Sequence, residues 1–220
     1  MRTQRVGVAA LVVFGLWAAP VAHAGGGRPA CDLINDASGD VMPTAPGVDN
    51  GNYDVTSADV ATDRRHLTVV IRLASLAAED AASPASRDYE FDFVANGHTF
   101  GMQAALLTGG ASYTAVVYDM ATPGGRSGTN LGAVTGVVDS TRHEIRMTAP
   151  LSLFAPYATF KQTYLDQLYV TSARAVGQNG TSSPDGKVTV GAQSTAVVVD
   201  DASSTARYSP GQRSCVHVGK

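Results

Sequence analysis

The chain contains few of the residues that give a sequence an obvious chemistry. Its 220 positions include two cysteines, one tryptophan and only 16% charged residues. Because no CxxC motif is present, a thiol–disulfide redox centre and a thiolate zinc site have no support. Hydrophobic residues at helical spacing are also almost absent, which argues against a helical domain.

Residues 1–24 are typical of a secretory signal peptide. Arg2 and Arg5 supply a positive start, residues 6–19 are apolar, and Ala22-His23-Ala24 has the small-x-small pattern of a cleavage site. We therefore expect a secreted, extracellular protein whose mature part is a single domain at 25–220. An uncleaved anchor is the alternative, but the apolar run is short for a membrane span. We expect no membrane span after cleavage.

Charge excludes two classes of partner. Cleavage removes Arg2 and Arg5 from 16 basic residues and leaves 14 against 19 acidic ones, a net charge of −5. Nucleic acids and anionic lipids select basic surfaces, so we expect neither as the main partner. The sequence gives no oligomeric state, but its length suits one domain with a sizeable core.

The two cysteines, Cys31 and Cys215, lie close to the two ends of the mature chain. In an oxidising compartment an even pair is most simply a disulfide, with free or intermolecular thiols as the alternative. A bond that closes so long a loop would stabilise the fold by up to about 5 kcal/mol in the chain-entropy model.

Alternating apolar residues predict short strands. Residues 67–73 place four apolar side chains on one face, and residues 89–93 place three aromatic rings on one face. Asn96-Gly97 is typical of a tight hairpin turn. Further strands are expected at 98–104, 112–118, 131–138, 143–149, 168–176 and 196–200, with Gly-rich loops at 121–130 and 177–191 and a helical turn at 150–154. The pattern predicts an all-β, antiparallel β-sandwich of the jelly-roll or immunoglobulin-like kind.

Several motifs, in their order, resemble a known group of secreted domains. They are the acidic opening Cys31-Asp-Leu-Ile-Asn-Asp-Ala-Ser-Gly-Asp40, the segment 53–60, the strand 67–73 and the run from Gly136 to Ser152. Over about residues 31–176 this order is similar to bacterial β-sandwich domains related to DOMON and family 9 carbohydrate-binding modules. The resemblance implies an extracellular binding or accessory domain, commonly stabilised by calcium.

The chain departs from these domains in its aromatic residues. Sugar-binding modules usually stack sugar rings on tryptophan, and the mature chain has none. Tyrosine also offers a flat apolar face and a polar edge. The tyrosines beside expected loops and strand ends, most of them equally well explained as core or surface residues, are Tyr113, Tyr118, Tyr157, Tyr164 and Tyr208. Haem-binding DOMON domains use Met and His, for which the chain offers His66, His98, Met102 and Met147 without a selective spacing.

The acidic opening segment is the candidate metal site. Its oxygen donors are Asn35, Asp36, Asp40, Asp49, Asn52 and Asp54. Calcium takes six to eight oxygen ligands in irregular geometry. We therefore expect a structural calcium ion with Asp36, Asp40 and Asp54 as the carboxylate ligands, and Asp63, Asp92 or Asp139 as candidates to complete the shell. The alternative is that these residues are ordinary turn formers.

The common catalytic motifs are missing. Gly110-Ala-Ser112 is not a GxSxG elbow, and His143-Glu144 lacks the second histidine of a zinc protease. No spacing marks a pair of glycosidase carboxylates. We expect a non-catalytic module, without catalytic residues, that binds an extracellular or cell-surface glycan. Two alternatives stay open, a secreted hydrolase with an unrecognised active site and a structural or adhesion module that binds a protein.

Overall fold

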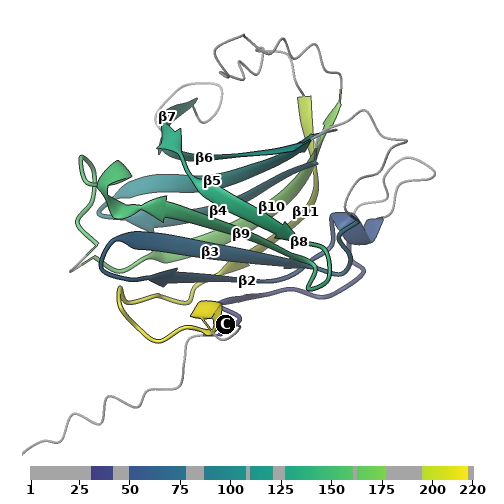
Figure 1. Cartoon of the computed structure of the whole chain (residues 1–220), viewed down its shortest axis with the longest axis horizontal. Helices are drawn as coiled ribbons and strands as arrows, with labels where there is room; N and C mark the ends of the chain where they lie inside the picture. Colours follow the sequence, from purple (N-terminus) through teal and green to yellow (C-terminus); the bar gives the residue numbers. More distant parts are fainter. Residues whose placement is uncertain are drawn as a thin grey trace, which may run out of the picture.

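Two antiparallel β-sheets pack face to face in the computed structural model of the chain (Figure 1). The model describes residues 31–41, 50–77, 87–107, 110–120, 127–160, 163–176 and 195–217. The all-β sandwich predicted from the alternating pattern is confirmed. The expected signal peptide at 1–24 lies outside the described residues. Within them, no helix has the length and apolar character that crossing a membrane requires.

One sheet has five strands and the other has six. The first has the order β1 (Ile34–Asn35), β2 (Val55–Thr62), β3 (His66–Leu73), β9 (Glu144–Pro150) and β8 (Thr135–Asp139). The second has the order β11 (Thr195–Ser204), β10 (Asp166–Val176), β4 (Arg87–Ala95), β5 (His98–Leu107), β6 (Gly110–Asp119) and β7 (Ser127–Ala133). Three short 3-10 turns, η1 (Asn50–Asn52), η2 (Leu151–Leu153) and η3 (Cys215–His217), complete the described elements. The helical turn expected at 150–154 corresponds to η2.

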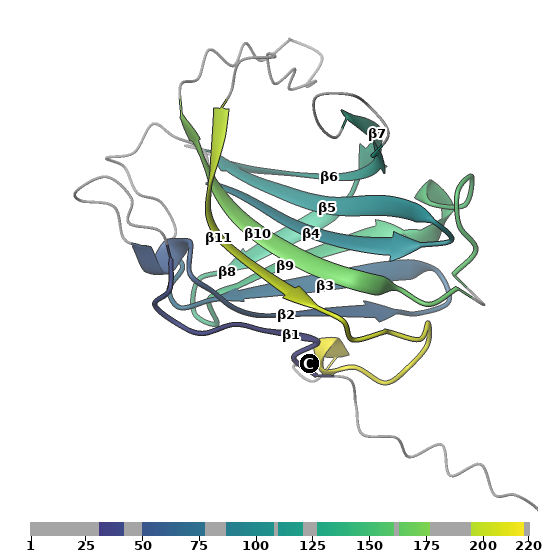
Figure 2. The same cartoon turned by 180° about the vertical axis from the view of Figure 1, so that it is seen from behind.

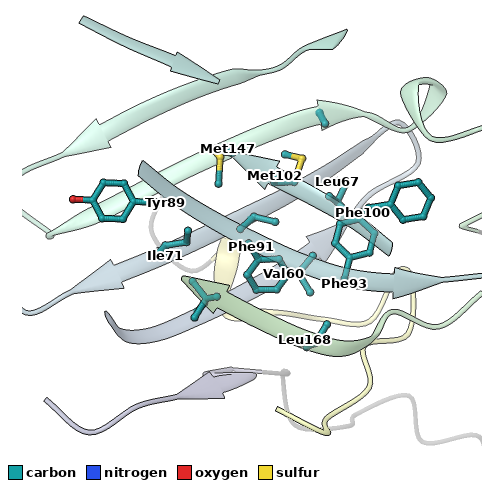
Figure 3. Close-up of a cluster of buried hydrophobic side chains, with 14 of the residues drawn as sticks. Val60, Leu67, Ile71, Tyr89, Phe91, Phe93, Phe100, Met102, Met147 and Leu168 are labelled. Atoms are coloured by element: carbon teal, nitrogen blue, oxygen red, sulfur yellow. The ribbon is translucent and has the colours of Figure 1, made fainter. Parts of the chain in front are cut away.

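The core lies between the sheets, where the predicted apolar faces meet. Leu67 and Ile71 of β3 are fully buried, as are Phe91 and Phe93 of β4. Figure 3 shows these side chains packed together with residues of β2, β5, β9 and β10. Full burial of such a side chain stabilises the fold by about 1.5–3 kcal/mol, so this cluster holds the two sheets together.

The hairpin between β4 and β5 has the expected turn. Asn96 and Gly97 have φ angles of 52° and 77°. A two-residue turn whose backbone matches the twist of the strands requires positive φ at both positions, which Asn and Gly adopt at the lowest cost. The turn pairs Ala95 with His98 and sets the register of the aromatic strand.

The prediction of a single strand at 131–138 is wrong, because the chain passes from one sheet to the other within these residues. Strand β7 begins at Ser127, inside the loop expected at 121–130, and ends at Ala133 in the six-stranded sheet. Strand β8 begins at Thr135 in the other sheet. The residues of β7 are mostly Ser, Gly, Thr and Asn, which are typical of loops. Pairing with β6 decides their conformation instead.

Strand β2 shows no clean alternation because it contains a bulge. The pairing with β3 shifts between Val55 and Ser57. As a result Val55, Ala58 and Val60 are all buried in the core, although Val55 and Ala58 are three positions apart.

The expected disulfide between Cys31 and Cys215 is confirmed. Their Cα atoms are 5.0 Å apart and 184 positions separate them in sequence. The bond joins the segment before β1 to the turn η3 and so links the first and last described segments of the chain.

Candidate metal centre and surface groove

Polar bonds join the two sheets at the start of β2. Three buried side chains, from the neighbouring strands β4, β10 and β11, each bond a backbone group of residues 52–55. The bonds are Tyr89 Oη to Asn52 O at 2.6 Å, Ser172 Oγ to Tyr53 O at 2.5 Å, and Val55 N to Asp200 Oδ2 at 2.7 Å. They fix Asp200 of one sheet against the first residue of β2 in the other.

Asp200 lies beside two aspartates of the opening segment. One carboxylate oxygen each from Asp36, Asp40 and Asp200 lies within 4.8 Å of the other two. We call these residues the aspartate cluster. Asp40 is exposed, Asp36 half-buried and Asp200 buried, so the cluster opens to solvent on one side. Figure 2 shows β1 and β11 approaching each other in this part of the molecule.

The described residues place no basic side chain in an ion pair with the cluster. Burial, together with the charges of Asp36 and Asp40, raises the pKa of Asp200 to about 6 against the lowering effect of the Val55 and Asp201 N–H bonds. Burial and neighbouring carboxylates likewise raise the pKa of Asp36. Both shifts report carboxylates held together in a partly desolvated place.

Asp54, the residue before β2, is hydrogen-bonded to the opening segment. Its Oδ2 accepts hydrogen bonds from Gly39 N at 2.7 Å and Ser38 Oγ at 3.2 Å. It is only 4% exposed, yet its Oδ1 has no hydrogen-bond partner among the described residues. The buried Oδ2 of Asp36 is in the same state. Of the three expected ligands, Asp36 and Asp40 come together, and Asp54 holds the turn between them.

The other candidate carboxylates are not part of the aspartate cluster, and Asn35 donates through Nδ2 to Asp32 O. Asn52 Oδ1 accepts a hydrogen bond from Ala77 N, and Asp63 and Asp139 accept backbone N–H groups in the turns that follow them. Asp92 lies on β4, opposite Gly101. Asp49 is outside the described residues. Sequence reasoning missed Asp200, although the pair Asp200-Asp201 directly follows the apolar run 196–199, a local signal that could have identified it.

A shallow groove lies at the C-terminal end of β4, beside the Asn96-Gly97 turn. Its volume is about 300 Å³, and its lining residues are Val94, Asn96, Gly97, Thr163, Tyr164, Asp166 and Arg207. Tyr164 is 55% exposed. Arg207 Nε lies 3.7 Å from Asp166 Oδ2, so a guanidinium and a carboxylate line the same groove as Tyr164. The groove combines a flat aromatic face with paired polar groups.

The remaining candidate tyrosines are part of the packed structure. Tyr208 is fully buried and Tyr118 is 9% exposed, while Tyr113 and Tyr157 pack against the core cluster. Tyr164 is thus the member of this set that offers its ring to solvent.

The residues considered for haem are not arranged for it. Met102 and Met147 are fully buried in the core (Figure 3), whereas His98 is exposed and His66 half-exposed beside Asp63. Sulfur and imidazole groups therefore lie in different surroundings, which haem ligation by a Met–His pair does not allow.

Comparison of the chain with models of protein families, with curated proteins and with solved structures found no match in any of the three. The resemblance to DOMON and family 9 carbohydrate-binding modules rests on the sequence motifs alone.

Proposed function

We propose that the protein is a secreted, non-catalytic β-sandwich that binds a glycan and is stabilised by calcium. The glycan part rests on one observation, the exposed ring of Tyr164 beside the Asp166–Arg207 pair in an open groove. An aromatic ring packs against the C–H face of a sugar, and a carboxylate and a guanidinium exchange hydrogen bonds with its hydroxyls.

The size and charge of the groove favour a neutral sugar. A volume of about 300 Å³ is at the small end of ligand pockets and suits one or two sugar rings. The charges of Asp166 and Arg207 balance each other, so the groove does not select a charged ligand. Without tryptophan, we expect modest affinity.

Secretion and calcium have separate support. The segment 1–24 has the pattern of a signal peptide, and the Cys31–Cys215 bond is of a kind that persists in oxidising compartments. The aspartate cluster supplies the hard oxygen donors that calcium prefers.

The test is retention of the purified mature protein on insoluble polysaccharides and cell-wall preparations. Tyr164→Ala should lower retention at least tenfold, and Tyr164→Phe, which keeps the ring, should retain most of it. Val137→Ala is the control, because Val137 is also an exposed apolar residue but lies on β8, away from the groove. Unchanged retention of Tyr164→Ala would refute the groove, and turnover of a glycosidase or esterase substrate would refute the non-catalytic role.

A further inference from the structure

The aspartate cluster draws its ligands from both sheets. Asp36 and Asp40 follow β1 of the five-stranded sheet, and Asp200 belongs to β11 at the edge of the six-stranded sheet. We infer that these three carboxylates together bind one calcium ion, which bridges the two sheets. The inference rests on the calcium part of the proposed function and adds to it a ligand, Asp200, from the far end of the chain.

The spacing of the oxygens fits one ion. Each Ca–O distance is about 2.3–2.6 Å, so oxygens on opposite sides of the same calcium are roughly 5 Å apart. One oxygen from each aspartate lies within 4.8 Å of the others, and one ion can therefore contact all three without a rearrangement of the backbone. The bond from Val55 N holds Asp200 in this position.

Buried oxygens without donors give a second, independent indication of a cation. Asp54 is 4% exposed with Oδ1 unpaired, and Asp36 Oδ2 is also buried and unpaired among the described residues. A buried carboxylate oxygen that accepts no hydrogen bond costs free energy. Asp54 is close enough for its charge to act on Asp36, so a cation at the cluster would offset both costs.

The donor set selects calcium over other divalent cations. The cluster contains only carboxylates, without the His or Cys ligands that zinc prefers. Magnesium demands a near-ideal octahedron, whereas calcium accepts irregular shells completed by water. Exposed Asp40 leaves one side of the cluster open to that water.

Asp54 is a positioning residue in this site. Its bonds to Ser38 and Gly39 hold the turn that separates Asp36 from Asp40. Asp54→Asn keeps all three ligands, so it should weaken calcium binding less than loss of a ligand does.

The experiment is calorimetric titration of CaCl2 into the chelator-treated mature protein, with thermal unfolding in parallel. Extracellular calcium sites commonly have Kd values of about 10⁻⁴–10⁻³ M. We expect a value in this range for the native protein and a melting temperature that rises with calcium. Asp200→Asn should weaken binding at least tenfold and abolish the rise at about 1 mM calcium, the upper end of that range. Asp40→Asn, which changes an exposed residue and cannot disturb the core, should do the same.

Asp201→Asn is the matched control. Asp201 is adjacent to Asp200 on β11 but is exposed and bonded to Tyr169 Oη. The calcium affinity of the Asp201→Asn variant should stay within threefold of the native value. Native affinity in Asp200→Asn would overturn the bridging site while leaving calcium binding intact. Absence of calcium binding to the native protein would overturn both, and retention on polysaccharides would then still test the groove separately.

Discussion

Two groups of carboxylates lie near β2, and they differ in whether an arginine pairs with them. Asp59 is fully buried, but Arg72 of β3 donates to it at 2.7 Å and to Glu144 of β9 at 3.0 Å. The aspartate cluster near the start of β2 has no such arginine among the described residues. Arg72 pairs with the first group, whereas under our proposal a calcium ion from solution binds the second. The free energy of unfolding should therefore depend on Arg72 at the first group and on the calcium concentration at the second.

The largest effect should come from removing the internal cation. Arg72→Met leaves the charge of buried Asp59 without an arginine, with the Leu33 N–H as a remaining donor, and loss of one partner of a buried ion pair typically lowers the free energy of unfolding by about 3–5 kcal/mol. Arg142→Met is the control, because Arg142 is half-exposed, lies 3.8 Å from Asp139 and should lose less than about 1 kcal/mol. Urea denaturation at fixed calcium measures both, and similar losses in the two variants would contradict the comparison.

The same Asp→Asn change should have opposite signs at the two groups. Asp59→Asn weakens the bond to Arg72 and should cost about 1–3 kcal/mol. In chelator, Asp200→Asn removes a charge from the cluster; its amide oxygen can still accept the buried Val55 N–H, and only the local bond from Asp201 N is lost. The metal-free variant should be as stable as the native protein or gain about 1 kcal/mol. Urea denaturation in chelator measures the pair, and a large loss in Asp200→Asn would show that its charge is needed for folding.

The smallest effect is a dependence on pH. Burial and the charges of Asp36 and Asp40 raise the pKa of Asp200 to about 6, above its unfolded value of 3.8, so the folded metal-free protein binds the proton more tightly. In chelator, stability should therefore fall as the pH rises through about 6, and lowering the pH from 7 to 5 should add on the order of 1 kcal/mol. The pKa of Asp36 is also raised, by burial and by the charges of Asp40, Asp54 and Asp201. Asp36 should therefore contribute to the pH dependence in the same direction as Asp200.

Saturating calcium should reverse this trend, because protons and calcium compete for the same carboxylates. Melting temperatures between pH 5 and pH 7, with calcium or chelator, give the comparison. Asp200→Asn isolates the contribution of that residue. A native protein in chelator that loses stability on acidification, with the same slope as the variant, would contradict the sign.

Local pattern predicted the parts of the fold that alternate strictly. Leu67 to Leu73 and the aromatic face of β4 lie in the core as expected, and Asn96-Gly97 forms the expected turn. The bulge in β2 and the sheet change before β8 depend on pairing with distant strands, which a window of a few residues does not contain.

The site shows the same division. Asp36 and Asp40 are near each other in sequence and were identifiable, but Asp200 joins them only because β11 packs near β1. Tyr164 was one of five candidate tyrosines. Its relation to Arg207 depends on the isolated bridge between Leu165 and Tyr208, which brings those two segments together.

The disulfide also determines how the molecule carries mechanical load. Cys31 and Cys215 enclose all described strands in one covalent loop. Tension applied to the chain outside these two residues passes through the sulfur atoms, and the strand pairs between them are not stretched. After reduction the force would reach β1, which pairs with β2 at Ile34 and Asn35 and leads directly to Asp36. While the bond is oxidised, pulling on the ends of the chain leaves both the aspartate cluster and the groove undisturbed.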